Sequence, residues 1–344
     1  MASLPNANQT ARIVEKLYRE LGTFVVELMQ DVRTEDIFRN PDGGLWMFRR
    51  GEGFVRAGEM PEDQAHSAIA TVASWHHTVI NHDHPILETE LPMNFFDAAR
   101  FEAIVPPVAR SPVFAIRMRP RKIFSLGDYE ASGILTEKTD PTNALRTNRA
   151  NFVESLRGRT HAEIIKRAVR EHMNILVVGP TGAGKTALAN GIVHEVAAAT
   201  PNDRIITIED TAELKCAAKN YVDLKATGNV TLDDCVRACL RLRPTRIIVG
   251  EVRGGEALQL LKSWLTGHPG GIATIHGLDV GSGLIQFESL VAEATSAPKQ
   301  RLIAETIQLV IFIGQDAANP AGRKVRELAV VEGYHDGRYV LVSV

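Results

Sequence analysis

Cysteine is scarce in this chain of 344 residues, and its scarcity limits the kinds of site that the chain can hold. The three cysteines are Cys216, Cys235 and Cys239, an odd number that includes no Cys-x-x-Cys pair. This spacing predicts reduced, buried thiols in a reducing compartment, rather than disulfides or a zinc site.

Long apolar runs and an excess of charge are missing as well. No window approaches 18 consecutive apolar residues, so we expect no transmembrane helix. The first eight residues lack the basic-then-apolar order of a signal peptide, which predicts a cytoplasmic location. The formal net charge of -2 gives no support to a protein that wraps nucleic acid.

The strongest positive signal is the segment 179–186, which reads G-x-x-x-x-G-K-T. The β-branched run 175–178 predicts a buried strand before it, and residues 187–196 predict a helix after it. Strand, glycine loop and helix together make a P-loop, in which backbone N–H groups and the helix N-terminus bind phosphate. A glycine-rich turn that binds nothing is the alternative, and the two flanking elements disfavour it.

The P-loop assigns roles to individual residues. Lys185 is expected to reach the β- and γ-phosphates, and the Thr186 hydroxyl is expected to bind Mg²⁺. We therefore predict ATP or ADP with Mg²⁺ on Gly179, Pro180, Thr181, Gly182, Ala183, Gly184, Lys185, Thr186 and Ala187.

The residues before the P-loop predict a smaller α+β domain, because helical and strand patterns are mixed there. The expected helices are 11–30 and 61–80, and the expected strands are 45–48, 95–104 and 113–118. A polar stretch that contains a proline follows and predicts a linker. The predicted units are an N-terminal domain at 1–135, a linker at 136–149 and a P-loop domain at 150–344.

Helical and β-rich segments alternate after the linker, which predicts an α/β domain with a mostly parallel sheet. The expected strands are 175–178, 204–208, 246–249, 271–275 and 309–313, with a closing hairpin at 326–344 around Asp336-Gly337.

Three polar side chains follow buried strands and are candidates for catalysis, since ligands bind at the carboxyl edge of such sheets. Glu209 is a candidate to polarise the attacking water; a solvated acidic loop is the alternative. Glu251 suits a Walker B carboxylate that acts on Mg²⁺ through water, although an ion pair with Arg253 is a fair rival. His276 is a candidate γ-phosphate sensor, with simple packing as its alternative.

Together these segments resemble the four ordered boxes of the secretion traffic ATPases. The boxes are the P-loop, Ile208-Glu-Asp-Thr-Ala-Glu-Leu, Gly250-Glu-Val-Arg-Gly-Gly-Glu-Ala and Thr266-Gly-His-Pro-Gly-Gly-Ile-Ala-Thr-Ile-His. Upstream segments such as Asn40-Pro-Asp-Gly-Gly-Leu-Trp resemble the conjugal-transfer branch, the TrbB type, so the resemblance covers nearly the whole chain. The type II branch usually has a tetracysteine zinc module that three cysteines cannot build. Retraction motors of type IV pili remain a weaker rival.

The resemblance implies a hexameric ring with a RecA-like C-terminal motor, and nucleotide between the motor and the N-terminal domain. Family arginines that neutralise phosphate match Arg100, Arg117 and Arg119; the alternative for each is a surface arginine. It also implies ATP hydrolysis that powers conjugative transfer, type IV secretion or pilus biogenesis. The expected partners are inner-membrane components of the apparatus, with peripheral attachment to the cytoplasmic face of that membrane.

Two other functional classes fit a P-loop. A DNA-translocating motor is disfavoured because it needs a basic, aromatic-lined channel, and aromatic residues make up 6% of this chain. We therefore expect no stable, specific nucleic-acid binding. A scaffold that binds nucleotide without hydrolysis is disfavoured by the presence of Lys185, Thr186, Glu209, Glu251 and His276.

Overall fold

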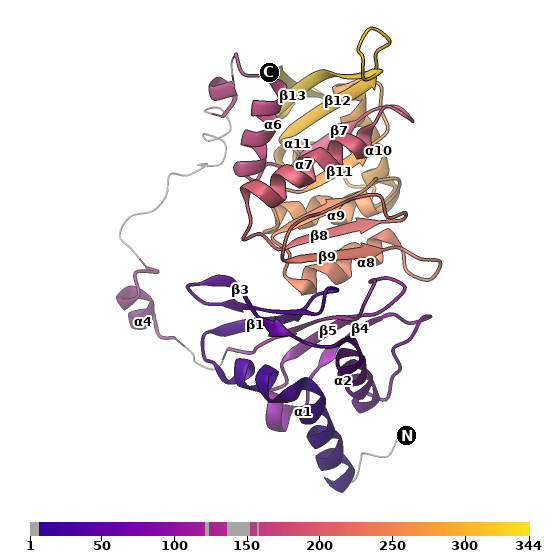
Figure 1. Cartoon of the computed structure of the whole chain (residues 1–344). Helices are drawn as coiled ribbons and strands as arrows, with labels where there is room; N and C mark the ends of the chain where they lie inside the picture. The colour runs from indigo at the N-terminus through magenta and orange to yellow at the C-terminus, as the bar shows by residue number, and fades with distance from the viewer. Residues whose placement is uncertain (1–6, 121–123, 136–151, 157) are drawn as a thin grey trace.

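The computed structural model describes residues 7–120, 124–135, 152–156 and 158–344, which form two β-sheets with separate helices (Figure 1). The six-stranded sheet lies in the N-terminal part of the chain, and the eight-stranded sheet lies in the C-terminal part. Among the described helices, none combines the length and apolar character that crossing a membrane requires.

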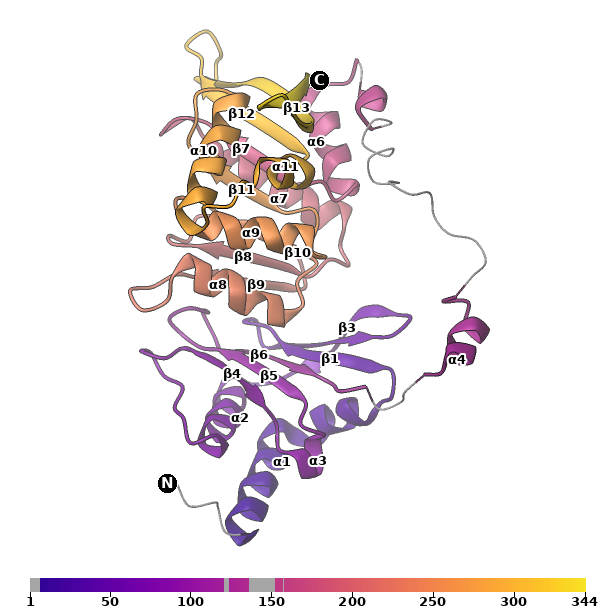
Figure 2. The ribbon, with the colours of Figure 1, turned by 180° about the vertical axis from the view of Figure 1, so that it is seen from behind.

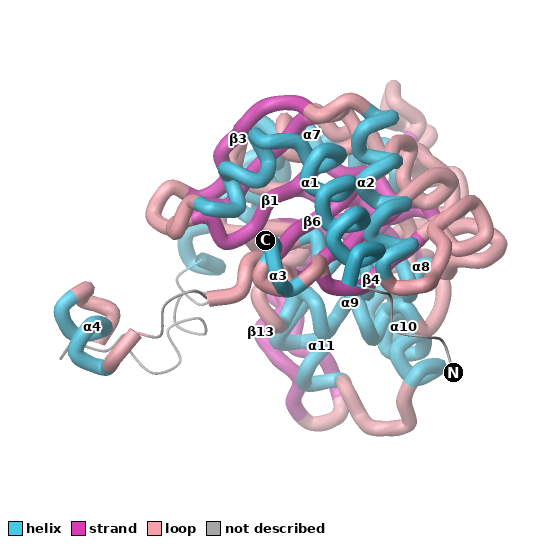
Figure 3. Tube along the Cα trace, turned by 90° about the horizontal axis from the view of Figure 1, so that it is seen from below, coloured by secondary structure: helices cyan, strands magenta, loops and turns pink. Residues whose placement is uncertain are grey.

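The N-terminal sheet is antiparallel, in the order β3-β2-β1-β6-β5-β4. Leu17 of α1 and Ile69 of α2 are buried in one core with Ile37 of β1, so the helices α1 and α2 cover one face of this sheet (Figure 3). The elements are α1 (Ala7–Gln30), β1 (Thr34–Arg39), β2 (Gly44–Arg49), β3 (Gly53–Glu59), α2 (Glu62–Trp75), β4 (Ile86–Glu90), α3 (Met93–Phe96), β5 (Arg100–Ile104) and β6 (Val113–Arg117).

Most predicted elements of this domain are present, and two are shorter than expected. The predicted strand 95–104 begins only at Arg100, because Asp97 and Ala98 have left-handed φ angles of 53° and 46°. The predicted helix 61–80 ends at Trp75, just before the left-handed His77. Strands β1, β3 and β4 were not predicted, and the predicted strands 45–48 and 113–118 are confirmed as β2 and β6.

The short helix α4 (Leu126–Ala131) follows this sheet and lies to the side of both sheets (Figure 2). The Ser125 hydroxyl accepts a hydrogen bond from the backbone N–H of Asp128, which forms a capping box at the start of the helix. The predicted linker 136–149 lies outside the described residues, so the boundaries 1–135 and 150–344 stay predictions.

The C-terminal sheet has the order β14-β13-β12-β7-β11-β10-β8-β9, and its six strands from β12 to β9 are parallel. This confirms the predicted parallel sheet, its five strands and the closing hairpin, but β9 was not predicted. The elements are α6 (His161–Arg170), β7 (Ile175–Val178), α7 (Lys185–Ala199), β8 (Ile205–Glu209), β9 (Tyr221–Lys225), α8 (Leu232–Cys239), η1 (Leu240–Leu242), β10 (Arg246–Val249), α9 (Glu256–Leu265), β11 (Ile272–Ile275), α10 (Val280–Ala294), α11 (Gln300–Thr306), β12 (Leu309–Gln315), β13 (Arg323–His335) and β14 (Arg338–Ser343).

Both faces of this sheet are buried, and alternate residues of each strand explain how. On β7, Val177 packs in the core with residues of α6 and α7, whereas Leu176 and Val178 pack in the core with residues of α8 to α11. This period of two reflects side chains that point to opposite faces of a strand. The result is a sheet with helices on both sides, as Figures 1 and 2 show from opposite directions.

The two sheets meet at a buried seam beside β9. Phe38 of β1 belongs to the same core cluster as Val222 of β9, and the fully buried Arg204 lies 4.3 Å from the centre of the Phe38 ring. Arg204 also donates to Asn40 at 2.7 Å, and Lys225 N donates to the carbonyl of Val108 at 2.7 Å. The N-terminal sheet is therefore attached to the C-terminal sheet through both side chains and backbone.

Candidate nucleotide site

The P-loop has the backbone that a phosphate-binding loop needs. It leaves the buried end of β7 and enters α7 at Lys185, with Gly184 as the N-cap residue at a φ of 92°. Gly182 also has a left-handed φ, of 75°, so both positions favour glycine. A Cβ on Gly179 would lie 2.5 Å from the carbonyl oxygen of Ile313, so no larger residue fits there without a shift.

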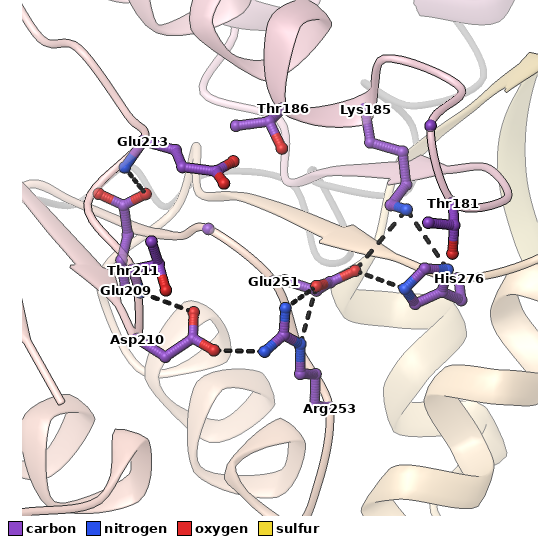
Figure 4. Close-up of a pocket in the computed structure, with 12 residues that line it drawn as sticks. Thr181, Lys185, Thr186, Glu209, Asp210, Thr211, Glu213, Glu251, Arg253 and His276 are labelled. Atoms are coloured by element: carbon purple, nitrogen blue, oxygen red, sulfur yellow. Dashed lines mark hydrogen bonds and ion pairs between the residues drawn. The ribbon is translucent and has the colours of Figure 1, made fainter. Parts of the chain in front are cut away.

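A cavity of about 260 Å³ opens beside this loop (Figure 4). Of the predicted loop residues, Thr181, Gly182, Lys185 and Thr186 line this cavity. Ala183 of the same loop is buried in the core. The lining of the cavity comes entirely from the C-terminal domain: Thr181, Gly182, Lys185, Thr186, Glu209, Asp210, Thr211, Glu213, Gly250, Glu251, Arg253 and His276.

Glu251 lies at the centre of the charged groups in this cavity. Its Oε1 is 3.7 Å from Lys185 Nζ and 2.9 Å from His276 Nε2, and its Oε2 accepts from Arg253 Nε at 2.8 Å (Figure 4). The ion pair between Glu251 and Arg253, given above as the alternative role of Glu251, is therefore present. Both residues line the cavity, so this ion pair is compatible with a role of Glu251 at the nucleotide site. The three predicted groups Lys185, Glu251 and His276 are brought together.

Lys185 is buried against the loop that it follows. It is 8% exposed, and its Nζ donates to the carbonyl of Pro180 at 3.4 Å. Burial lowers the pKa of the Lys185 ammonium, whereas the Glu251 carboxylate opposes that shift. The side chain thus contacts its own loop and the Walker B carboxylate at once.

Glu209 is held by the backbone of the loop that follows it. It ends β8, is 6% exposed, and its Oε1 accepts the backbone N–H groups of Glu213 and Leu214 at 3.0 and 2.9 Å. Burial raises the pKa of Glu209, although the two N–H groups oppose the shift. A fixed carboxylate with a raised pKa suits a general base.

Arg253 connects two of the predicted boxes. Its guanidinium pairs with Glu251 from the Walker B segment and with Asp210 from the segment after β8 (Figure 4). Hydrogen bonding to Glu251 raises the pKa of Arg253. The sequence indicated the first pair but not the second, because Asp210 lies 43 residues earlier in the chain.

The two histidines of the last box have different environments. His276 follows β11, and its Nδ1 is 3.4 Å from Lys185 Nζ. His268 instead contacts the carbonyl oxygen of Pro244 through Nδ1 at 2.7 Å, and burial lowers its pKa. Of these two histidines, only His276 lines the cavity, and its role as a γ-phosphate sensor stays a prediction.

The three predicted arginines lie elsewhere in the chain. Arg100 begins β5; Arg117 ends β6, with its Nε 3.9 Å from Asp36. Arg119 pairs with Glu90 at 2.9 Å. None of the three lines the cavity, so their phosphate-binding role stays a prediction.

Comparisons with known proteins agree with this architecture. Residues 141–320 match the family model described as "Type II/IV secretion system protein". The chain is 39% identical to the "Probable conjugal transfer protein TrbB" of Sinorhizobium fredii, over 96% of this chain and 94% of that protein. It is 31% identical to "Protein VirB11" of Agrobacterium fabrum, over 81% of this chain and 83% of that protein.

A solved structure shows that the fold is shared as well. The crystal structure of the VirB11 ATPase from the Brucella suis type IV secretion system, in complex with sulphate, matches with a TM-score of 0.81 and 22% identity. The match covers 94% of this chain and 96% of that one. This match confirms the predicted architecture, in which a smaller α+β domain precedes the α/β domain in the chain. The chain therefore belongs to the type II/IV secretion system family, as a P-loop ATPase of the TrbB and VirB11 type.

Proposed function

We propose that this chain is a Mg²⁺-dependent ATPase whose turnover powers conjugative transfer through a type IV secretion apparatus. The observation that carries the proposal is the cavity beside the P-loop, where Lys185, Glu251 and His276 meet and Glu209 is fixed nearby. These side chains supply a phosphate-binding cation, a Walker B carboxylate, a γ-phosphate sensor and a base.

The contacts of Glu251 suggest how the site changes when nucleotide binds. Lys185 and Arg253 are both held by this one carboxylate, so Lys185 has to release Glu251 in order to reach the β- and γ-phosphates. His276 is positioned to register that exchange, because it contacts both Lys185 and Glu251. Glu209 keeps its position throughout, since backbone N–H groups of its own loop hold it.

The chain's residues fit a Mg²⁺ ion that is held mainly by phosphate. The described residues contain no group of three His, Cys, Asp or Glu side chains able to hold a metal alone. Thr186 and Glu251 both line the cavity. When Mg²⁺ is bound, Thr186 would be a direct ligand and Glu251 would act through water. When bound, the ion would neutralise phosphate charge and help to position the attacking water.

The placement of the arginines supports assembly into a ring. Among the described residues, none from the N-terminal domain lines the cavity, while Arg100 and Arg117 are exposed on that domain. We propose a homo-hexamer in which a neighbouring copy supplies Arg100, Arg117 and Arg119 to the phosphates. The ring would attach from the cytoplasm to inner-membrane components of the conjugation apparatus and serve transfer or pilus biogenesis.

The test is steady-state phosphate release from ATP by the purified full chain, with and without Mg²⁺. We expect turnover only with Mg²⁺, and we expect single-stranded DNA to leave the rate unchanged. No phosphate release under any nucleotide or metal condition would support the non-hydrolysing scaffold. Strong stimulation by single-stranded DNA would favour a DNA-translocating motor instead.

A further inference from the structure

Arg323, at the start of β13, lies against the P-loop although the two are far apart in sequence. Strand β12 pairs with β7 in parallel, so the loop after β12 leaves the sheet at the same edge as the P-loop. A Cβ built on Gly184 would lie 2.4 Å from Arg323 Nη1 and 2.9 Å from its Cδ. The guanidinium therefore covers the last glycine of the loop.

The described side chains that line the cavity carry more negative than positive charge. Two cations, Lys185 and Arg253, face four carboxylates in the lining, and both cations are already paired with Glu251. A triphosphate with Mg²⁺ is still an anion, so a lining with excess negative charge opposes its binding. Positive charge from a side chain outside this lining would therefore favour phosphate binding.

Arg323 is such a side chain. It is exposed and forms no ion pair within the described part of the chain, and its Nε donates weakly to the carbonyl of Ala321 at 3.4 Å. Arg326, three residues later, is different: its Nη2 donates to the carbonyl of Gln315 at 2.6 Å. Of these two arginines on one strand, only Arg323 lies over the P-loop.

We propose that Arg323 binds the α- and β-phosphates of the nucleotide held by its own chain, a role that rests on the proposed function. The position follows from Gly184, because P-loop backbone N–H groups hold these two phosphates while the following lysine reaches the β- and γ-phosphates. An arginine is suited to the task, since its planar fork donates two parallel hydrogen bonds to phosphate oxygens. Arg323 thus supports nucleotide binding rather than the hydrolytic step.

The test compares Arg323→Ala, Arg323→Lys and the matched control Arg326→Ala in the full chain. ATP and ADP binding are measured by calorimetry with Mg²⁺, and turnover gives KM and kcat. We expect Arg323→Ala to weaken ATP and ADP alike by about tenfold and to raise KM with little change in kcat. Arg323→Lys should recover part of the loss, because it keeps the charge but not the fork.

Three results would overturn this assignment. The first is wild-type affinity in Arg323→Ala, and the second is a loss confined to ATP, which would place the guanidinium at the γ-phosphate. Equal weakening by Arg326→Ala would also overturn it, because general loss of surface charge would then explain the effect. If the wild-type chain binds nucleotide and turns over while Arg323→Ala matches it, this inference fails and the proposed function stands.

Discussion

The seam between the two sheets and the cavity beside the P-loop both contain arginines, but in opposite environments. At the seam, Arg204 is fully buried, stacks on Phe38 and donates to Asn40, and burial lowers its pKa to about 9. At the cavity, Arg253 and Arg323 are exposed. Burial among fixed partners makes an arginine part of the architecture, whereas exposure beside a phosphate-binding loop leaves it able to change partners.

Replacing the proposed base should strongly reduce turnover, which tests the cavity side of this comparison. Glu209→Gln keeps the hydrogen bonds of the side chain but cannot accept a proton, so ATP should bind while kcat falls about a thousandfold. Because burial raises the pKa of Glu209, wild-type turnover should fall as the pH drops through that raised value. Rapid-quench and equilibrium-binding measurements check both statements. Normal turnover in Glu209→Gln, with Glu251→Gln inactive, would assign the base to Glu251.

Removing the buried arginine should have the largest effect at the seam. Arg204→Ala leaves Asn40 and Asn220 without their shared donor and removes the stacking on Phe38, so we expect a loss of about 3 kcal/mol in the free energy of unfolding. Urea unfolding measures this change. Arg110→Ala is the control, since its exposed pair with Asp223 should contribute less than about 1 kcal/mol. Equal effects of the two substitutions would contradict the distinction drawn here.

A buried carboxyl makes the seam sensitive to pH. Glu102 is 3% exposed beside Arg241, and burial raises its pKa from 4.5 to about 8. The folded state keeps this proton while the unfolded state loses it, so stability should fall as the pH rises from 4.5 to 8.

The substitution Glu102→Gln tests this dependence. Glutamine does not titrate, so the decline should flatten, and between pH 4.5 and pH 8 the variant should gain roughly 4 kcal/mol in stability relative to the wild type. Thermal unfolding across that pH range measures the gain. A second cavity, at the seam, is lined by Glu88, Glu102, Asp234, Arg237 and Arg241. The exposed Glu88 gives the control Glu88→Gln, which should keep most of the wild-type slope, since burial is the main cause of the raised pKa of Glu102. An unchanged slope in Glu102→Gln would exclude Glu102 as the source.

Arg117 is one of the cations that we assign to a neighbouring copy of the chain. Replacing it should have the smallest effect of the substitutions in this comparison. Arg117→Ala should weaken ATP by about tenfold, ADP by less, and lower turnover, because the γ-phosphate is its partner. In mixed assemblies, Lys185→Ala chains should restore turnover to Arg117→Ala chains, since each supplies what the other lacks. Equal losses for ATP and ADP, or no restoration on mixing, would contradict this role.

The sequence predicts the cavity better than the seam, for a physical reason. Glu209, Glu251 and His276 each lie at the carboxyl end of a buried strand of one parallel sheet, so local patterns alone place them at one edge. In the sequence, Arg204 predicts only the first residue of a strand. Its partner Asn40 lies 164 residues away, so no local pattern indicates their contact. Arg323 was missed likewise, because only the pairing of β12 with β7 brings it to Gly184.

Local backbone conformation set a second limit on prediction. The apolar run before Arg100 suggests a strand, but α3 and two left-handed residues interrupt it. Strand β9 was missed because alternation over five residues, Tyr221–Lys225, is a weak signal beside the long apolar runs of the central strands.

The most direct test of the account is phosphate release by Lys185→Ala, measured beside the wild type under saturating ATP and Mg²⁺. Lys185 supplies charge to the phosphates, so turnover should fall to background. Circular dichroism and thermal unfolding should show that the fold is intact. Hydrolysis at the wild-type rate in a folded Lys185→Ala chain would contradict the assignment of the P-loop cavity as the catalytic site.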